Sequence, residues 1–580
     1  MTTVRMNYET IDYDILVIGA GGAGLRAAVE ASVGGLSVGV LSKSLLGKAH
    51  TVMAEGGVAA ALGHVAAEDD WRVHFRDTMR SGHFLNNSRM VELLAREAPE
   101  RVLELEAWGA VFDRDPEGRV MQRAFGAHTY PRLAHVGDRT GKELLRTLQD
   151  RAVHQGVRIH AEFTVTMLLK HGERVAGALA YQRSTGAFTL FRARAVILAT
   201  GGGGRLFRVT SNSWECTGDG LWLALRAGAE LIDMEMVQFH PTGMVWPPGV
   251  RGLLVTEGVR GEGGILRNRD GERFMSRYDP ARMELSSRDV VARAIYAEVQ
   301  AGRGGPHGGV YLDISHRGKE YILRKLPGMR NQFLSLADVD ITQQAMEVAP
   351  TCHYMMGGVK VEPDSCETAI PGLFAVGEVA GGVHGANRLG GNSLADLLVF
   401  GCRAGRHAAL YAENSAPRTV DEATVEQEIA RVMEPPARST GENPYMLHRE
   451  LQALMTDHAG IIRHGKSLLE GLEQLRAISD RARACAAPGG PHFNPGWHMV
   501  FDLESLLGLA EAVLLSALAR EESRGAHTRH DYPEERRDLA LINYHTTLLG
   551  DALVVTPGAA YPMADELQQL VPEWAETPSR

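Results

Sequence analysis

Apolar and polar positions at the start of the chain follow the order of a strand, a helix and a second strand. Residues 13–20 form an apolar run that predicts a buried strand. The next segment, residues 21–32, opens on glycines and continues as a helix, which Gly34 and Gly35 end. Residues 36–44 are again mostly apolar and predict the second strand. The chain therefore begins with a strand–helix–strand unit.

Two later segments also run from a strand directly into glycines. Residues 174–182 and 188–200 are apolar runs joined by a short turn, which predicts a hairpin whose second strand enters the glycines at 201–204. Residues 372–394 hold another junction between a strand and a glycine-rich loop. Because these strand ends lie far apart in sequence, we expect one α/β nucleotide-binding domain assembled from separate segments.

The remaining segments have other patterns. Residues 239–350 lie between parts of the nucleotide-binding domain and are expected to form an inserted domain. From residue 417 onward apolar residues recur at helical spacing, which predicts a helical domain to about residue 525. Residues 526–580 are expected to form a small C-terminal domain. Residues 1–238 and 351–416 then make up the two parts of the nucleotide-binding domain.

The composition is that of a globular protein, with 580 residues, 44% hydrophobic and 23% charged. A net charge of −10 argues against nucleic acid as a partner. The five cysteines show no C-x-x-C spacing, so we expect no metal site, iron–sulfur cluster or structural disulfide in this chain. We see no targeting peptide at the N-terminus and no apolar run near the ~20 residues needed to span a bilayer.

The first strand–helix turn has the spacing G-x-G-x-x-G. Gly19 allows the tight turn, Gly21 lets the backbone approach a pyrophosphate, and Gly24 allows close packing of helix and strand. The helix N-terminus adds N–H donors for phosphate. The second strand ends on Ser42-Lys43, where an acidic residue usually holds the ribose of NAD. The motif therefore predicts a dinucleotide other than NAD.

His50 follows this second strand, at the edge where a dinucleotide would lie, and by itself such a histidine is more often an ordinary surface or core residue. Its segment, HTVMAEGG, resembles the flavoprotein subunit of succinate dehydrogenases and fumarate reductases, the respiratory complex II group. Further motifs resemble the same family, occur in the family's order and span nearly the whole chain. They are QFHPTG at 238–243, TEGVRGEGG at 256–264, SSRDVVARAI at 286–295, TCHYMMGG at 351–358, HGANRLGGNSL at 384–394 and SRGAHTRHDYP at 523–533.

The resemblance implies a Rossmann-like FAD-binding domain with an inserted α+β capping domain, followed by a helical domain and a small C-terminal domain. It also implies FAD as cofactor, bound covalently through His50, whose neutral imidazole would act as the nucleophile. Ser42-Lys43 is ordinary among bacterial members of the family. The residues expected to contact FAD are Gly19, Ala20, Gly21, Gly22, Ala23, Gly24, Ser42, Lys43, His50, Thr51, Gly56, Gly57, Thr200, Gly201, Asp219, Glu378, Ser393 and Leu394.

The resemblance further implies a C4 dicarboxylate, succinate or fumarate, as substrate. A dianion needs cations or donors at both ends, and the matching residues are His240, Thr256, His353 and Arg388. Outside their motifs, Arg388 would be taken for a surface charge and the histidines for core residues. The backbone of Phe125 and Gly126 is also expected to face the substrate. The sequence reads FGA there, where the family commonly has FGG, so the third residue adds a Cβ.

Arg288 matches the residue that moves the substrate proton in this family. Glu257 and Arg260, three residues apart, match its relay to solvent. Arginine is an unusual base because its guanidinium normally stays protonated, and chemistry alone would favour a neutral histidine. The catalytic assignment of these residues therefore rests on the resemblance.

The implied activity is that of the flavoprotein subunit of a succinate:quinone oxidoreductase, which oxidises succinate and passes electrons to an iron–sulfur subunit. Quinone would be reduced in membrane anchor subunits, and the chain would lie peripherally on the cytoplasmic face of the bacterial inner membrane. Fumarate reduction uses the same residues and stays open. A soluble enzyme like L-aspartate oxidase, which lacks the histidine linkage, and a non-catalytic flavin-binding protein stay open as well.

Overall fold

A seven-stranded sheet forms the centre of the computed structural model, which describes residues 8–416 and 419–575. Its strand order is β6-β2-β1-β9-β8-β7, with β16 beside β9, and β6, β2, β1, β9 and β16 run parallel. The predicted hairpin is the antiparallel pair β8–β9. The strands are β1 (Glu9–Ile18), β2 (Val38–Ser42), β6 (Arg158–Ala161), β7 (Phe163–His171), β8 (Arg174–Gln182), β9 (Phe188–Leu198) and β16 (Leu373–Ala375).

The first strand begins earlier than its apolar pattern predicts. The pattern places it at residues 13–20, whereas β1 runs from Glu9 to Ile18. Its first half has mostly exposed or half-exposed side chains but pairs with β9 through the backbone, from Glu9 opposite Thr189 onward. Backbone pairing leaves no trace in the hydrophobic pattern, so only the buried half is visible in the sequence. The strand ends before Gly19, whose φ of +118° turns the chain.

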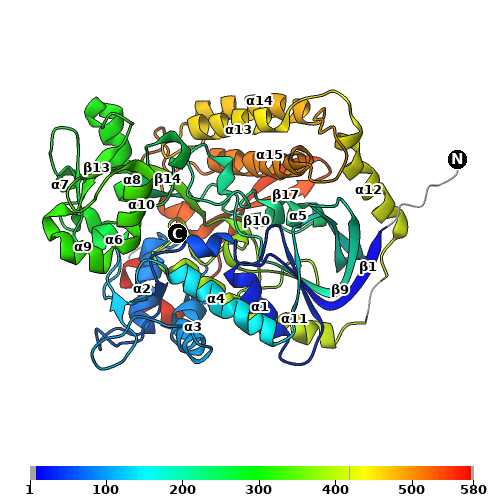
Figure 1. Cartoon of the computed structure of the whole chain (residues 1–580), viewed down its shortest axis with the longest axis horizontal. Coiled ribbons are helices and arrows are strands. Elements are labelled where there is room, and N and C mark those ends of the chain that lie inside the picture. Colours follow the sequence, from blue (N-terminus) through cyan, green and yellow to red (C-terminus); the bar gives the residue numbers. More distant parts are fainter. Residues whose placement is uncertain (1–7, 417–418, 576–580) are drawn as a thin grey trace.

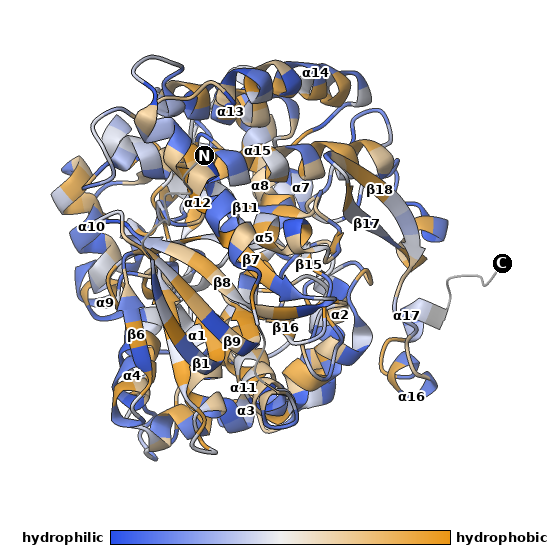
Figure 2. Cartoon of the chain, turned by 90° about the vertical axis from the view of Figure 1, so that its right-hand side faces the viewer, coloured by the Kyte–Doolittle hydropathy of each residue, from blue (hydrophilic) through white to orange (hydrophobic). Residues whose placement is uncertain are grey.

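Helices cover this sheet and enclose its buried strands (Figure 1). Helix α1 (Gly22–Ala31) packs against α11 (Asn392–Glu413), and α11 also contacts β9. Helix α5 (Asp219–Ala227) lies beside β7 and beside α15 (Pro495–Ala519). Hydrophobic segments, orange in Figure 2, run along several of these strands with hydrophilic blue segments among them. The four buried residues that end β1, Ile15 to Ile18, belong to the largest apolar core.

An inserted lobe, the cap, carries a second sheet and a core of its own. The antiparallel order is β11-β14-β13-β12, and the core includes Leu266, Ile295 and Leu312. Two paired strands, β11 and β14, lead the chain into and out of the cap. Figure 1 shows the cap in green at one end of the molecule. Its elements include β11 (Val237–Met244), β12 (Ile265–Arg267), α8 (Arg288–Glu298), α9 (Lys319–Lys325), α10 (Pro327–Ala337), β13 (Val310–Asp313) and β14 (Met346–Met355).

Four helices follow in the region expected to be helical. They are α12 (Glu422–Ala437), α13 (Pro444–His458), α14 (Gly465–Ala482) and α15 (Pro495–Ala519). The expected first residue of that region, 417, lies outside the described residues. Helix α14 buries one stripe that includes Leu468, Leu472 and Leu475, whereas α15 is buried on most of its surface. Both helices share the apolar core of the central sheet.

The C-terminal segment is also packed into the body. Strands β17 (Ile542–Leu549) and β18 (Ala552–Ala559) extend a four-stranded sheet of order β15-β10-β17-β18, with β10 (Leu231–Ile232) and β15 (Gly358–Val359). The side chains of Leu567 and Val571 then pack with those of α2 (Trp71–Ser81) and α3 (Ser88–Ala107). Residues 1–7 of the expected nucleotide-binding domain and residues 576–580 of the expected C-terminal domain lie outside the described residues.

Candidate active site

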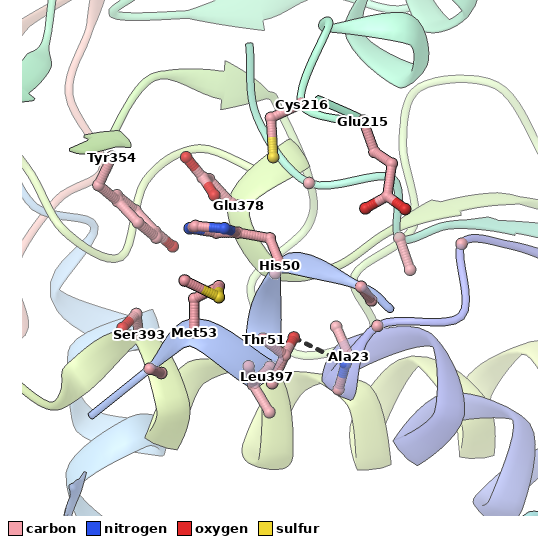
Figure 3. Close-up of a pocket in the computed structure, with 18 of the residues that line it drawn as sticks. Ala23, His50, Thr51, Met53, Glu215, Cys216, Tyr354, Glu378, Ser393 and Leu397 are labelled. Atoms are coloured by element: carbon pink, nitrogen blue, oxygen red, sulfur yellow. Dashed lines mark hydrogen bonds between the residues drawn. The ribbon is translucent and has the colours of Figure 1, made fainter. Parts of the chain in front are cut away.

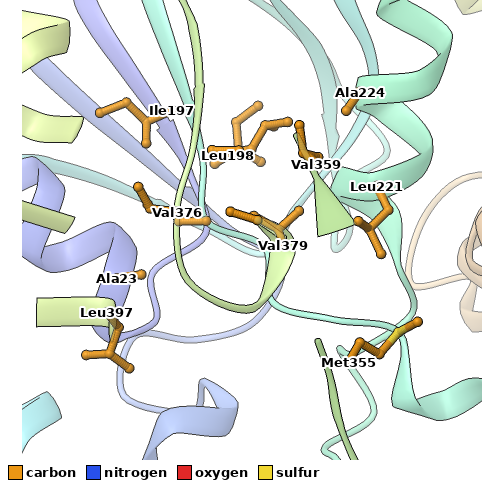
Figure 4. Close-up of a cluster of buried hydrophobic side chains, with 14 of the residues drawn as sticks. Ala23, Ile197, Leu198, Leu221, Ala224, Met355, Val359, Val376, Val379 and Leu397 are labelled. Atoms are coloured by element: carbon orange, nitrogen blue, oxygen red, sulfur yellow. The ribbon is translucent and has the colours of Figure 1, made fainter. Parts of the chain in front are cut away.

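The carboxyl ends of β1, β2, β9 and β16 open on one cavity. Its lining residues come from many separate segments of the chain between Ile18 and Leu397. All three glycine-rich strand ends contribute lining residues, among them Gly21, Gly201 and Gly377. Beneath them, apolar side chains such as Leu198, Val376 and Val379 pack together and support the strand ends (Figure 4). The separate glycine segments therefore build one site, as the sequence predicted.

The three glycines of the first turn have different surroundings. A Cβ on Gly24 would lie 1.9 Å from the Gly19 carbonyl oxygen, and one on Gly19 would lie 2.1 Å from the Ala199 oxygen. A Cβ on Gly21 would meet nothing closer than Thr51 Oγ1, at 3.4 Å. Gly19 and Gly24 are thus required by the packing of the chain itself, whereas Gly21 faces the cavity. The N-terminus of α1 opens there, as phosphate binding needs.

Thr51 closes the other side of this turn. The Gly22 N–H donates to Thr51 Oγ1 at 3.1 Å, the dashed contact in Figure 3. Thr51 belongs to a short 3₁₀ turn, His50–Met53, so the same turn that supports the glycine loop also carries His50.

Lys43 is held in a buried cluster at one end of the cavity. Its Nζ lies 2.8 Å from Asp219 Oδ2, 2.6 Å from Asp502 Oδ1 and 2.7 Å from Thr217 Oγ1. Burial alone would lower the pKa of Lys43, but the carboxylates of Asp219 and Asp502 outweigh it and raise the pKa. The lysine is therefore charged and neutralised by two carboxylates. Sequence reasoning named Lys43 and Asp219 but missed Asp502, which comes from α15.

The imidazole of His50 is neutral and both of its nitrogens have a neighbouring donor. The Ser213 N–H donates to Nδ1 at 3.3 Å, and Asn212 Nδ2 lies 3.5 Å from Nε2. Burial, with a smaller effect from the Arg388 guanidinium, lowers the pKa of His50 to about 4. Figure 3 shows the ring projecting into the space that Glu378 and Tyr354 also face. A neutral imidazole is the form that can act as a nucleophile.

Polar groups without partners line the same space. Thr200 Oγ1, Glu55 Oε2 and Glu215 Oε1 are buried and make no hydrogen bond within the described part of the chain. Burial also raises the pKa of Glu378 to about 7, although the Met355 N–H donates to its Oε1 at 3.0 Å. Buried polar atoms normally have partners. These residues therefore fit a large polar ligand, and the glycine turn fits its phosphates.

Two arginines meet at the end of the cavity beneath the cap. Arg288 Nη1 and Arg388 Nη2 both donate to Gln238 Oε1, each at 3.2 Å. Arg388 Nη1 also donates to Ser393 Oγ at 2.9 Å. Burial, assisted by the Arg288 guanidinium, lowers the pKa of Arg388 to about 9, so it stays protonated at neutral pH. Arg288 comes from the cap helix α8 and Arg388 from the body, and this pair suits a carboxylate ligand.

Glu257 connects Arg288 to two residues behind it. Arg288 Nε donates to Glu257 Oε2 at 2.8 Å, and Arg260 Nη2 lies 3.6 Å from the same oxygen. The Gly126 N–H donates to Glu257 Oε1 at 2.9 Å. Burial would raise the pKa of Glu257, but the guanidiniums of Arg288 and Arg260 hold it below its ordinary value. An ionised carboxylate thus lies between two arginines, in a row that leads away from the cavity.

His240 and His353 also lie at the end of the cavity beneath the cap, as neutral side chains that can donate or accept hydrogen bonds. Their rings lie edge to face with centroids 5.1 Å apart. Burial and the nearby charged groups hold the pKa of each far below 6.5. His353 Nδ1 lies 2.8 Å from Ser211 Oγ, and Thr256 lines the cavity beside them.

The departure from glycine in the FGA turn has a visible consequence. Ala127 adopts φ +63°, in the left-handed region where an alanine is strained. Its N–H lies at the limit of hydrogen bonding to the Leu285 oxygen, at 3.4 Å. The turn therefore keeps a conformation suited to glycine while carrying a Cβ.

The structure brings nearly all the predicted residues to this cavity. The predicted residues that do not line it are Gly24, which packs on Gly19, and Gly126 and Arg260, which lie behind Glu257. Sequence reasoning missed Gln238 and Tyr354, although both stand in motifs that it quoted. It gave no role to Glu55, in the quoted motif HTVMAEGG, and missed Ser211; both line the cavity. Gln238 could have been noticed as the polar first residue of the motif QFHPTG. Ser211 lies in none of the quoted motifs, so no signal in the sequence pointed to it.

Comparisons with known proteins identify the class of this site. The FAD binding domain family matches residues 14–394, and the C-terminal family of fumarate reductase flavoproteins matches residues 448–554. The cavity therefore belongs to an FAD-binding protein, which confirms the predicted cofactor.

Relatives define the family further. A subunit of the fumarate reductase (CoM/CoB) of Methanothermobacter marburgensis is 47% identical, over 92% of this chain and 96% of that protein. The succinate dehydrogenase flavoprotein subunit of Coxiella burnetii is 41% identical, over 95% of this chain and 96% of that protein. A solved structure, Mycobacterium smegmatis Sdh1 in complex with UQ1, is 53% identical, covers 98% of both chains and superposes with a TM-score of 0.89. The chain belongs to the flavoprotein subunits of succinate dehydrogenases and fumarate reductases, and is an FAD-dependent oxidoreductase with the predicted fold.

Neither a membrane-crossing helix nor a metal cluster occurs in the part of the chain that the structure describes. Over residues 8–416 and 419–575, no helix combines the length and hydrophobicity needed to cross a membrane. The same residues contain no group of three or more histidine, cysteine or acidic side chains placed to hold a metal ion. All five cysteines are buried and free.

Proposed function

We propose that this chain oxidises succinate to fumarate as the flavoprotein subunit of a succinate:quinone oxidoreductase. The observation that carries the proposal is the pair of buried arginines, Arg288 and Arg388, on one acceptor at the end of a cavity whose other end is a dinucleotide turn. The test is reduction of an artificial dye by the purified holoprotein with succinate. No dye reduction above that without succinate would contradict the proposal.

The residues at the phosphate end hold the cofactor. Gly21 and the N-terminus of α1 would receive the phosphates, and Lys43, Asp219 and Glu378 also line the cavity. When bound, FAD supplies a hydride acceptor. The chain's own task is to place the substrate against it and to exclude water.

The substrate is held as a dianion. Arg388 binds one carboxylate, with Ser393 Oγ fixing the direction of its guanidinium. The neutral rings of His240 and His353, and the hydroxyl of Thr256, supply directional hydrogen bonds. Phe125 closes the apolar side of this space. This arrangement favours a short dicarboxylate over a monocarboxylate because only the former occupies both sets of contacts.

The proton leaves through the row of charged groups. Arg288 faces the cavity and passes the proton to Glu257 at 2.8 Å, which lies 3.6 Å from Arg260. Glu257 is ionised, so it has a lone pair for the proton that Arg288 gives up as Arg288 takes one from the substrate. Arg288 comes from the cap, and we propose that closure of the cap places it on the substrate.

A covalent bond joins FAD to His50 in this proposal. The low pKa keeps the imidazole neutral, so one ring nitrogen keeps the lone pair that a bond to the flavin 8α-methyl carbon would need. The test is acid precipitation, followed by in-gel fluorescence and the mass of the peptide that contains residue 50. Flavin in the supernatant of a preparation made with its partner subunits would contradict the bond, and His50→Ala is the matched control that must release flavin.

Fumarate reduction is the second candidate, because the relative from Methanothermobacter marburgensis is named a fumarate reductase. The same residues serve either direction, and the potentials of the partners decide which one prevails. Rates in both directions, measured with dyes of graded potential on the assembled complex, separate the two. Faster fumarate reduction at every potential would favour this second candidate.

Electrons must leave the chain through partners. Its relatives are named as subunits, and we propose two kinds of partner, an iron–sulfur subunit that takes the electrons from FAD, then membrane anchor subunits that reduce quinone. The chain would then lie on the cytoplasmic face of the membrane, held by these partners. Quinone reduction by the isolated chain at the rate of the dye would contradict this arrangement.

Simple tests separate the proposal from an amino-acid oxidase and from a protein without turnover. An enzyme like L-aspartate oxidase would oxidise L-aspartate and release its flavin in acid. A non-catalytic flavin-binding protein would bind a dicarboxylate without reducing a dye.

A further inference from the structure

One motif contributes no residue to the cavity lining. Residues 523–533, SRGAHTRHDYP, form a turn after α15, here called the C-terminal turn. Every residue that lines the cavity comes from other segments. The turn nevertheless contacts the two segments that carry Arg288 and Arg388, the arginines that both donate to Gln238.

The first contact is with the loop that carries Arg388. Gly525 has φ +55°, and a Cβ there would lie 2.5 Å from the Ala386 oxygen. The Ala526 N–H donates to the same oxygen at 2.9 Å. Ala386 precedes Arg388 by two residues, so the turn fixes the backbone from which that guanidinium projects.

The second contact is with the cap helix that carries Arg288. Arg293 lies on the same helix, α8, and its Nη1 donates to the Gly525 oxygen at 2.8 Å. Its Nη2 donates to Asp289 Oδ2 at 2.9 Å, which orients the guanidinium from within the cap. Figure 1 shows α8 at the edge of the cap nearest the body. One residue, Gly525, therefore touches both the loop of Arg388 and the helix of Arg288.

The C-terminal turn is itself firmly anchored. Arg524 Nε and Nη2 donate to the two oxygens of Glu522, at 2.8 and 3.0 Å, and its Nη1 donates to the His83 oxygen at 2.9 Å. His527 Nδ1 lies 2.8 Å from Arg463 Nη1, and Arg529 Nη1 donates to the Ala517 oxygen at 2.8 Å. Most of these side chains are fully buried. Such a network makes the Gly525 carbonyl a fixed reference point.

We propose that Arg293 is a positioning residue that latches the cap to the Gly525 carbonyl and thereby sets the distance between the Arg288 and Arg388 guanidiniums beside a bound dicarboxylate. The choice of ligand rests on the proposed function. Arg388 holds one carboxylate and Arg288 must reach the carbon chain beside it to take the proton, so the two guanidiniums need a fixed separation. The Arg293 side chain keeps 32% of its surface exposed, so water can replace the carbonyl when the cap opens to release product.

The test compares Arg293→Gln with Arg303→Gln in the holoprotein. Arg303 is the matched control because it pairs with Glu298 wholly inside the cap, at 2.8 Å, and has a similar exposure of 38%. We expect Arg293→Gln to lower kcat/KM for succinate by about tenfold, the loss of one hydrogen bond from a charged group. Affinity for malonate, a short dicarboxylate, read from the flavin absorbance change, should weaken by a similar factor. Arg293→Lys, which restores one donor, should recover part of both losses.

Hydrogen exchange supplies a readout that does not depend on turnover. Peptides of α8 should exchange faster in Arg293→Gln than in the control, with malonate present, while flavin content stays that of the wild type. Equal kinetics, malonate affinity and exchange in the two variants would overturn the latch. A wild-type protein that neither turns over succinate nor binds malonate would instead refute the proposed function. In that case faster exchange of α8 in ligand-free Arg293→Gln would still support the latch, and equal exchange would reject it.

Discussion

The dinucleotide end and the dicarboxylate end of the cavity differ in which atoms form them. At the dinucleotide end, backbone atoms of consecutive residues, Gly19 to Gly24, lie between packed neighbours. At the dicarboxylate end, side chains from distant segments converge. Arg288 comes from the cap helix α8, Gln238 from strand β11 and Arg388 from a loop of the body. The glycine turn at the first end is thus set by neighbours in sequence, whereas the second end is complete only when two lobes meet. Binding of the cofactor and turnover of the substrate should therefore fail separately.

Arg288→Gln is expected to give the largest difference between the effect on turnover and the effect on flavin binding. Turnover of succinate should fall by at least about 10²–10⁴-fold, the usual contribution of a proton-transfer group, because the row through Glu257 loses its first member. Flavin content should stay that of the wild type, since Arg288 lies in the cap and the glycine turn lies in the body. Both are read from one preparation by dye reduction and flavin absorbance. Activity within about tenfold of wild type would remove Arg288 from the proton path.

A pair of alanine substitutions tests the dinucleotide end in the same way. Gly24→Ala should destabilise even the flavin-free protein, because its Cβ would lie 1.9 Å from a backbone oxygen. Gly21→Ala has 3.4 Å of clearance to the nearest protein atom, so the flavin-free protein should melt normally and yet bind FAD more weakly. Thermal melts with and without FAD distinguish the two. Identical behaviour of both variants would mean that Gly21 does not face the phosphates.

A smaller effect is expected for Gln238→Leu, which removes the acceptor shared by two guanidiniums. Dicarboxylate affinity should weaken by about tenfold, the value of one hydrogen bond to a charged group, because Arg288 and Arg388 are no longer drawn together. The flavin content should not change. Inhibition constants for malonate measure the effect, and an unchanged constant would show that the substrate itself sets the spacing.

The glycine turn of the dinucleotide end could be predicted from the sequence more fully than the dicarboxylate end. Gly19, Gly21 and Gly24 are legible because backbone constraints act between neighbours in sequence. Gln238 and Ser211 acquire their roles only when the cap strands and the body pack together, and Asp502 reaches Lys43 from a helix far along the chain. Periodicity carries no information on such pairings. The family resemblance supplied His240, His353 and Arg388, which physical reasoning from single residues would have left as core or surface positions.

The pH dependence of stability extends the comparison to the histidines. His240 is buried, with 1% of its surface exposed, and its pKa is held well below 6.5, so it stays neutral in the fold but takes up a proton when unfolded. Above about pH 7.5 this histidine has no pH-dependent effect on the free energy of unfolding. As the pH falls below about 6.5 it lowers that free energy, by about 1 kcal/mol between pH 6.5 and 5.5. Unfolding free energies of wild type and His240→Asn at these two pH values measure it. An equal loss in both proteins would contradict the assignment.

The smallest expected effect concerns the strained residue beside the dicarboxylate end. Ala127 has φ +63°, a conformation that costs an L-residue about 1 kcal/mol and a glycine little. Ala127→Gly should therefore stabilise the protein by about 1 kcal/mol, less the backbone entropy that glycine adds to the unfolded chain. Because Gly126 next to it donates to Glu257, a looser turn should also lower kcat slightly while flavin binding stays unchanged. Denaturant unfolding and dye reduction measure the two effects, with Ala187→Gly, in the hairpin turn between β8 and β9, as the control. A loss of stability equal to that of the control would show that the left-handed conformation carries no strain.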